Sequence, residues 1–378
     1  MSGVQSYAEI IEQIDLIDPL AYAKTRNHLG GAVTHLSPYL SRGVITLPQV
    51  KARLLARHRP ADCAKLLQEL AWREYFQNVW WEKGNAIFSD LRFPRDDWEH
   101  EDLVSALVGA ETGIAALDDA VKKLYDTGYM HNHARMWVAS VACNVARAHW
   151  YGMGMWLYYH LLDSDPASNF LSWQWVAGTS VHKRYTTSQS LINACSDTKQ
   201  PHTWLSLERE ATLTMPIPEH LLQSEPVILP MEYPEQPEVM SVFGAEVYLY
   251  TPWTLDPGWR RAGDGSTDGD RGSHTRRLLI IDPAWFDRFP VSPFVLDFII
   301  RQGQTVMPEL EVFVGDVYDM PGITEAVAVY TKAHPTNQSW PGQHDPRELL
   351  APAVTGYFPS FFKYWQKAER SVLRPEHS

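Results

Sequence analysis

The sequence predicts a mainly α-helical protein in which a helical first part is followed by a smaller α/β unit. Apolar residues recur at three- and four-residue spacing from residue 5 to about residue 195, which is the period of an amphipathic helix. Seven prolines then interrupt regular structure over residues 197–240, and short β-rich runs follow. The length of 378 residues suits two domains. We therefore expect a helical domain over 1–200, a proline-rich linker over 201–239 and an α/β domain over 240–378.

The individual elements follow from local pattern. The helical spacing is clearest over 63–80 and 113–125. In the last third, we expect strands at 246–251, 277–282 and 310–315, with helices at 292–303 and 322–333. Residues 254–275 hold five glycines and many charges without apolar spacing, which predicts a surface loop and not a nucleotide-binding turn.

Composition excludes several classes of protein. No uninterrupted apolar run approaches the roughly 20 residues that cross a bilayer, and the N-terminus has no pattern of a secretion or transit signal. We therefore expect a cytoplasmic protein without a membrane role. Cys63, Cys143 and Cys195 are too widely spaced for a zinc finger, and their odd number argues against a disulfide framework. The net charge of -12 lies mainly in residues 201–378, which hold 14 Lys and Arg against 24 Asp and Glu. The nearly neutral first half can therefore still present a local basic face, so charge does not exclude a nucleic-acid partner.

Two early segments combine polar groups with a helix. In Thr34–Gly43, Ser37 is expected at an N-cap and Pro38 at the first helical position. Such a helix start can attract a phosphate, and the same pattern by itself is also that of an ordinary helix start. Offsets of three and four place Glu69, Trp72 and Arg73 on one helical face. A salt-bridged surface face with one core Trp fits the second pattern equally well.

Two later segments are richer in chemistry. Residues 127–136 concentrate polar side chains in a predicted helix, where Asn132, Arg135 and Met136 share a face. Residues 163–175 crowd Asp163, Asp165, an amide and two indoles into one stretch. A calcium loop is rejected because Pro166 comes early and no bidentate Glu follows, so we expect no metal.

Together, in this order, the four segments resemble the flavin-binding domain of the DNA photolyase and cryptochrome family over residues 20–180. The resemblance implies FAD as cofactor. The residues that the resemblance places around the FAD phosphates and ribityl chain are Tyr22, Thr34, Leu36 and Ser37. Those that it places around the isoalloxazine are Arg73, Asn132, Arg135, Asp163, Asp165 and Asn169. Arg135 can pair with Asp163, and an amide at Asn169 can hydrogen-bond a protonated or an unprotonated flavin N5.

The resemblance also implies a substrate pocket and an electron supply. The family's pocket for cyclobutane pyrimidine dimers matches Glu69, Trp72, Asn132, Met136 and Trp175, and its tryptophan chain matches Trp173, Trp150 and Trp98. The resemblance therefore implies catalytic roles for Glu69, Asn169 and the three chain tryptophans. The implied activity is blue-light-driven repair of these dimers in DNA by electron transfer, a carbon–carbon lyase reaction. The alternative is a cryptochrome-type photoreceptor without repair activity.

Three departures from the family pattern carry consequences. The flavin segment begins within the first two dozen residues, so the resemblance is to a form lacking the N-terminal antenna domain, and residues 240–335 are a candidate for its relocated counterpart. After Trp175, the Ser180–Tyr185 segment stands where the family usually has a Pro-Tyr-Phe-Arg segment, so the pocket wall near residue 180 is expected to differ. His133 replaces a frequent arginine, which removes a permanent phosphate contact and favours single-stranded over duplex UV-damaged DNA.

Overall fold

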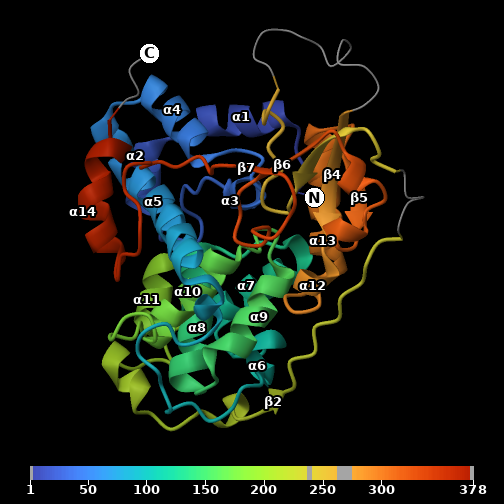
Figure 1. The fold of residues 1–378 in the computed structure, drawn as a ribbon. Helices are drawn as coiled ribbons and strands as arrows, with labels where there is room; N and C mark the ends of the chain where they lie inside the picture. The colour runs from blue at the N-terminus through green and yellow to red at the C-terminus, as the bar shows by residue number, and fades with distance from the viewer. Residues whose placement is uncertain (1–2, 236–240, 262–274, 375–378) are drawn as a thin grey trace.

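Helices make up most of the first half of the chain in the computed structural model, which describes residues 3–235, 241–261 and 275–374 (Figure 1). Reciprocal capping boxes begin two of them, with Ser6 and Glu9 at α1 and Thr46 and Gln49 at α4. The predicted mainly helical first part is confirmed. The helices are α1 Tyr7–Asp15, α2 Pro19–Thr25, α3 Ser37–Ser41, α4 Leu47–Arg57, α5 Pro60–Lys83, α6 Ser105–Val108, α7 Ala115–Thr127, α8 Asn132–Ser140, α9 Trp150–His160, α10 Pro166–Ala177 and α11 Gln189–Cys195.

A five-stranded parallel sheet forms the α/β unit, in the order β5-β4-β3-β6-β7. The first strand therefore lies in the middle, with two later strands on each side, as in doubly wound folds. Helices α12 Pro283–Phe286 and α13 Pro293–Val306 connect β4 to β5. The predicted small α/β unit is confirmed. Its strands are β3 Glu246–Tyr250, β4 Thr275–Ile281, β5 Glu311–Val314, β6 Ala328–Lys332 and β7 Gln343–Asp345.

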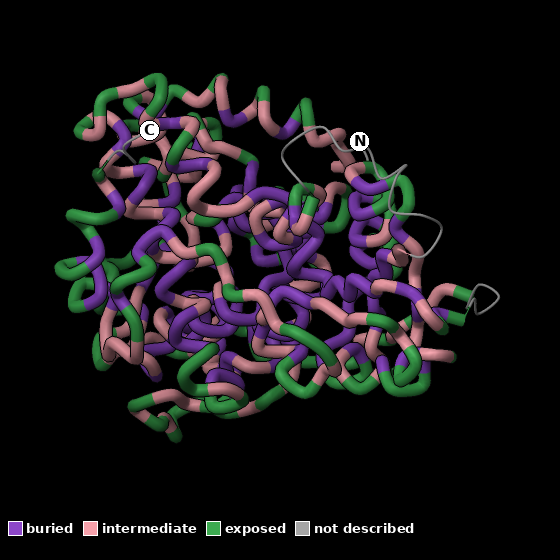
Figure 2. Tube along the Cα trace, turned by 45° about the horizontal axis from the view of Figure 1, so that its top comes forward, coloured by how far each residue is buried: buried purple, intermediate pink, exposed green. Residues whose placement is uncertain are grey.

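The two faces of the sheet pack differently because side chains alternate along a strand. On β3, Tyr248 and Tyr250 belong to the large core cluster that also contains the helical half, whereas Val247 and Leu249 belong to a separate small cluster. One face of the sheet is therefore joined to the helical half by a continuous apolar core, which Figure 2 shows as buried chain through the middle of the molecule. The domain boundaries stay a prediction.

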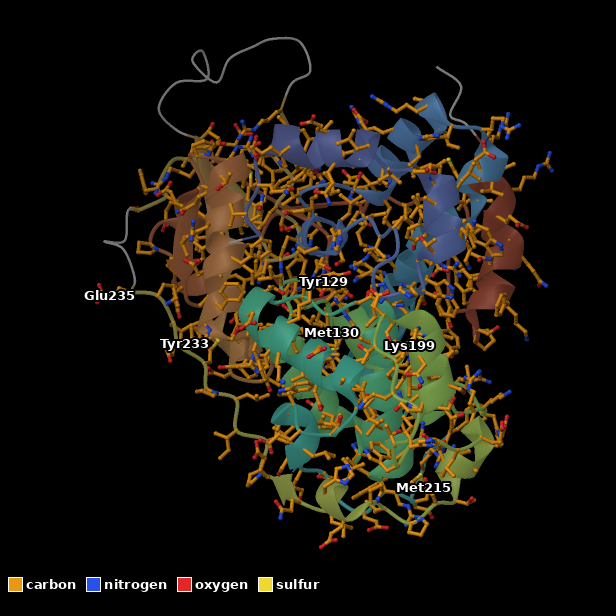
Figure 3. All side chains as sticks on the ribbon, turned by 180° about the vertical axis from the view of Figure 1, so that it is seen from behind. Tyr129, Met130, Lys199, Met215, Tyr233 and Glu235 are labelled. Atoms are coloured by element: carbon orange, nitrogen blue, oxygen red, sulfur yellow. The ribbon has the colours of Figure 1, made fainter. Side chains whose placement is uncertain are left out.

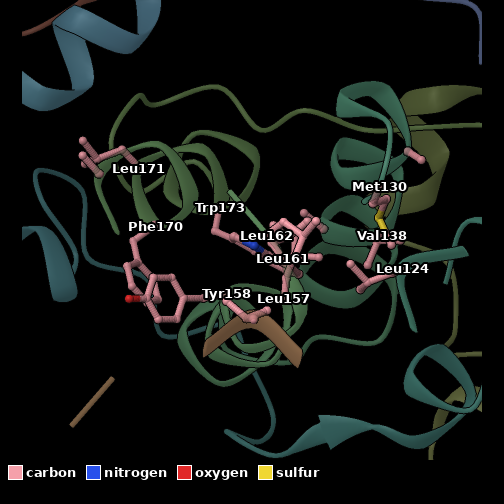
Figure 4. Packing of buried hydrophobic residues seen from close by; sticks show 14 of the residues in the cluster. Leu124, Met130, Val138, Leu157, Tyr158, Leu161, Leu162, Phe170, Leu171 and Trp173 are labelled. Carbon is pink, nitrogen blue, oxygen red and sulfur yellow. The ribbon is translucent and has the colours of Figure 1, made fainter. Parts of the chain in front are cut away.

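The core of the helical half is aromatic. Tyr158 and Phe170 stack with ring centroids 5.8 Å apart, and both are fully buried. Figure 4 shows these rings on one side of the cluster, with Trp173 and Leu161 beside them. This packing fixes the α9 to α10 connection, which carries the acidic segment 163–165.

Two segments return to the helical half from the later chain. Residues 201–235 contain the short helices η3 Arg209–Leu213 and η4 Glu219–Leu221, and β2 Ser224–Glu225 pairs with β1 Leu103–Val104. The C-terminal helix α14 Phe361–Val372 lies along α5 (Figure 1). Its position is fixed by the buried Glu74 carboxylate of α5, which accepts hydrogen bonds from the backbone of Leu350 and Ala351 and, at 2.6 Å, from the Tyr364 hydroxyl.

Three local expectations were wrong. The predicted helix at 322–333 is instead a 3-10 turn, η7 Ile323–Glu325, followed by strand β6, because pairing with β3 and β7 satisfies the backbone there. Helix α3 begins one residue early, so Leu36 is its N-cap and Ser37 is its first residue, without a side-chain cap. The polar run 127–136 is not one helix, because α7 ends at a left-handed Gly128 and α8 begins after His131.

The predicted strands at 246–251, 277–282 and 310–315 and the predicted helix at 292–303 are confirmed within a few residues. Most of the expected loop at 254–275 lies outside the described residues. Across the described ranges, every helix is either too short or too polar to cross a bilayer.

Candidate functional site

A cavity of about 580 Å³ opens among α2, α5, α8 and α10, beside the acidic segment 163–165. Four segments far apart in the sequence meet in its walls, and Tyr129, near the centre of the view in Figure 3, is one of its lining residues. Of the residues named from the sequence, those lining this cavity are Tyr22, Thr34, Ser37, Glu69, Trp72, Arg73, Asn132, Arg135, Met136, Asp163, Asp165, Asn169, Trp173 and Trp175.

Three of the named residues lie outside the cavity lining. Leu36 is 1% exposed and packs into the core. Trp150 is also buried, and its indole Nε1 donates to Asp90 Oδ1 at 2.7 Å. Trp98 is 38% exposed. The roles assigned to these residues stay predictions.

A buried ion pair forms one wall. Arg135 Nη2 lies 3.1 Å from Asp163 Oδ2, as the sequence predicted, and Arg135 Nε donates to the Met130 carbonyl at 2.8 Å. Burial alone would raise the pKa of Asp163, but the charges of Arg135 and Arg73 outweigh it and hold that pKa below its usual value. Asp163 therefore stays ionised at neutral pH.

Arg73 and Asp165 form a second, looser pair. Their closest N–O distance is 3.7 Å, and Arg73 Nη1 also donates to Ser41 Oγ at 2.9 Å. The Asp165 carboxylate accepts from Gln77 Nε2 at 2.5 Å and from the Ser168 amide at 2.6 Å, where it caps α10. Because Asp165 is anchored by two other donors, Arg73 keeps donor capacity for a further partner.

Asn169 has a fixed orientation. Its Nδ2 donates to the Gly154 carbonyl at 2.9 Å, within the tight α9–α10 contact. The amide oxygen is therefore the free end of this buried side chain, and no described residue donates to it.

Two other polar groups at the cavity lack partners. His131 Nδ1 accepts from the His133 amide at 3.1 Å, and burial lowers the pKa of His131 to about 4. The neutral ring therefore carries its proton on Nε2, which is a buried donor without a partner among the described residues, as is the Ser168 hydroxyl. Buried polar groups are rarely unpaired, so these atoms indicate a polar ligand in the cavity.

Glu69 is held by two cations from different elements. Lys65 Nζ lies 2.7 Å from its carboxylate, and Arg26 Nε lies 3.5 Å away. All three side chains are partly exposed at the rim of the cavity. The sequence pattern found Glu69 but not Arg26, because that contact joins α2 to α5.

Each wall indole is backed by an aromatic ring that lies outside the sequence motifs. Trp72 stacks on Phe361 of α14 with ring centroids 3.9 Å apart and planes 12° apart. Trp175 packs against Tyr185 at 5.5 Å. The Ser180–Tyr185 departure was visible in the sequence, but nothing in the sequence pairs Phe361 with Trp72.

Two of the three departures from the family pattern, His133 and the Ser180–Tyr185 segment, contact each other in the structure. His133 Nδ1 lies 2.6 Å from the Asn27 carbonyl and must donate to it, so His133 Nε2 is the acceptor that faces the Tyr185 hydroxyl at 3.4 Å. Burial, the largest influence, lowers the pKa of His133. His133 is therefore neutral at pH 7, as expected.

The tryptophans named as a chain are linked through another ring. Trp98 contacts His149 at a centroid distance of 5.3 Å, and His149 contacts Trp150 at 5.4 Å. Trp173 lies at the cavity, while Trp150 packs on Phe170 at 6.4 Å. His149 was missed because its position between Trp98 and Trp150 depends on the turn before α9.

Comparison with known proteins finds relatives for the part of the chain that contributes most of the cavity residues. The sequence profile described as the FAD binding domain of DNA photolyase matches residues 66–202. A deoxyribodipyrimidine photo-lyase of Streptomyces griseus is 33% identical over 156 residues, which cover 41% of this chain and 34% of that protein. A cryptochrome DASH of Gloeobacter violaceus is 30% identical over 189 residues, which cover 47% of this chain and 37% of that protein.

The matches are partial. The chain spans about a third of the length of the curated relatives it matches. The solved structure of a Synechocystis cryptochrome has a TM-score of 0.45 and 25% identity, covering 50% of this chain and 43% of that one.

FAD is the cofactor of this domain, and the cavity residues fit it. The volume of about 580 Å³ suits a large organic ligand. Arg73 and Arg135 offer positive charge, while the free amide oxygen of Asn169, the His131 Nε2 donor and the Ser168 hydroxyl offer hydrogen bonds that no described residue satisfies. These groups would hold the cofactor from several sides.

Proposed function

Because its residues 66–202 belong to the photolyase and cryptochrome family, we propose that this chain is a blue-light-driven, FAD-dependent lyase that repairs cyclobutane pyrimidine dimers in DNA, with a preference for single strands. The observation that carries the proposal is the shared cavity. Glu69, Trp72, Asn132, Met136 and Trp175 line the same space as Arg135, Asp163 and Asn169. A base bound by the first group would therefore lie close to a cofactor held by the second.

The side chains suit a flipped, damaged base. A dimer stacks and pairs poorly with its neighbours, so extruding it costs less than extruding a normal base. Trp72 and Trp175 offer aromatic faces, and the Glu69 carboxylate, oriented by Lys65 and Arg26, can accept hydrogen bonds at the base edge. Reduced FAD, when bound and excited by blue light, supplies the electron that splits the cyclobutane ring.

We propose separate roles for the remaining named residues. Trp173 lies at the cavity wall and is the residue through which Trp150 and Trp98 would deliver electrons to restore the reduced cofactor. Asn169 presents its amide oxygen to the cofactor. The neutral His133 adds no permanent charge at the rim, which motivates the single-strand preference.

Anaerobic illumination of dithionite-reduced, FAD-loaded protein tests the proposal, using a single-stranded oligonucleotide with one thymine dimer. Chromatography counts restored thymines against a dark control. Multiple turnovers are expected, and absence of light-dependent dimer loss with bound, photoactive flavin refutes the repair function.

Two variants test the assigned roles. Trp173→Phe is expected to block photoreduction of the flavin and to spare repair by chemically reduced protein. Trp72→Ala is expected to weaken binding of the damaged strand and to leave photoreduction intact. Identical behaviour of both variants would contradict the separation of roles.

A cryptochrome-type blue-light receptor is the second candidate, because cryptochrome DASH proteins are among the matched relatives. It predicts photoreduction of the flavin and light-dependent binding of a partner without dimer turnover. The illumination experiment separates the two candidates directly.

A further inference from the structure

The C-terminal helix α14 brings an exposed aromatic residue to the edge of the cavity wall. Phe361, its first residue, is buried and stacks on Trp72, and the next residue, Phe362, is 66% exposed and meets Trp72 edge-on at 6.5 Å. Trp72 lines the cavity. An exposed phenyl ring therefore lies beside the indole to which we assign the damaged base.

Exposed cations continue the same face of α14. Lys363, Lys367 and Arg370 are spaced by four and three residues, so they form one stripe along the exposed side of the helix, next to the exposed Phe362. None of the three cations pairs with a carboxylate among the described residues. They stand out in a half of the chain that holds 14 Lys and Arg against 24 Asp and Glu.

The opposite face of α14 is occupied. Its apolar residues, Tyr364, Trp365, Ala368 and Val372, are buried in the core shared with α5. A basic amphipathic helix can bind a membrane surface only through a free apolar face, which α14 does not have. The exposed aromatic and basic face instead suits a polyanion that also offers rings for stacking, which is a nucleic acid strand.

We propose that α14 is a strand-contacting element outside the flavin domain, in which Phe362 stacks on a base next to the damaged site and Lys363, Lys367 and Arg370 contact its flanking phosphates. This inference rests on the proposed repair function and extends its binding surface to a helix that lies beyond residues 66–202. Glu74 and Tyr364 hold α14 in place, so the contact surface is preformed.

The test measures affinity for a dimer-containing single-stranded oligonucleotide as a function of salt. Each phosphate contact adds about 0.7 to the slope of log affinity against log salt for a single strand, so Lys363→Ala/Lys367→Ala should reduce the slope by about 1.4. Over a fourfold rise in salt, the parent should therefore lose roughly 7-fold more affinity than this variant. Phe362→Ala should weaken binding by roughly tenfold.

Arg288→Ala/Arg301→Ala is the matched control, because it removes two exposed cations from the α12–α13 side of the molecule, away from α14 (Figure 1). The control should keep the parent's salt slope. If the parent binds and repairs the dimer and both double variants share its slope, the role of α14 is overturned while the repair function stands. If the parent binds no damaged strand, both proposals fall.

Discussion

Removing the Glu74 carboxylate should release the C-terminal segment from α5. Glu74 is 1% exposed and accepts from two backbone amides and the Tyr364 hydroxyl, with Arg347 close enough to contribute a favourable charge. In Glu74→Ala these three donors lose their acceptor, and each orphaned buried donor costs about 1 to 3 kcal/mol. Relief of the desolvation cost of a buried carboxylate offsets part of the loss, which leaves about 3 to 5 kcal/mol.

Hydrogen exchange detected by mass spectrometry measures this loss locally. Since each 1.4 kcal/mol is about a factor of ten, amides of residues 347–372 should exchange roughly 10² to 4 × 10³ times faster in Glu74→Ala, while the sheet should keep its protection. Tyr364→Phe removes one of the three donors and should accelerate the same segment by about tenfold or less. Glu82→Ala, at an exposed position of α5, is the control. An acceleration in Glu74→Ala no larger than in Glu82→Ala would refute the reasoning.

Three further predictions concern the site and the core. Phe361→Leu keeps an apolar side chain but removes the stack on Trp72, so affinity for the damaged strand should fall roughly fivefold while FAD content stays at the parent level. Phe361→Tyr keeps an aromatic ring and should bind the damaged strand as tightly as the parent. Equal affinities of the parent and both variants would contradict a stacking role. Arg135→Met leaves buried Asp163 without its main cation, so FAD should be retained poorly on gel filtration, and full retention would show that this pair does not shape the cavity. Burial, with a smaller effect of Arg347, lowers the pKa of His334 to about 3, below its unfolded value near 6.5. The neutral ring therefore contributes stability that is complete above pH 6.5 and is lost as pH falls towards 3. In thermal melts, the melting temperature of His334→Gln should therefore decline less over this pH range than that of the parent. Parallel profiles of melting temperature against pH would contradict this role of His334.

Periodicity was sufficient for most elements. Strands β3, β4 and β5 and helix α13 lie where β-rich runs and helical spacing predicted them, because their apolar residues face one core side or alternate between two. Segment 322–333 is the exception. Its apolar residues are compatible with a helix, and only the free edges of β3 and β7 on either side make it strand β6.

The sequence by itself predicted most of the polar and aromatic side chains that line the cavity, although Leu36, Trp98 and Trp150 lie outside it. The offsets that put Glu69, Trp72 and Arg73 on one face of α5 hold regardless of what packs against that helix, and the Arg135–Asp163 pair follows from opposite charges on neighbouring motifs. Only the tertiary structure decided which residues from other parts of the chain contact these side chains and the predicted tryptophan chain. Phe361 reaches Trp72, His149 lies between Trp98 and Trp150, and Tyr185 faces His133 through contacts between segments whose separation along the chain carries no periodic signal. Such contacts depend on how whole elements pack, which local spacing cannot encode.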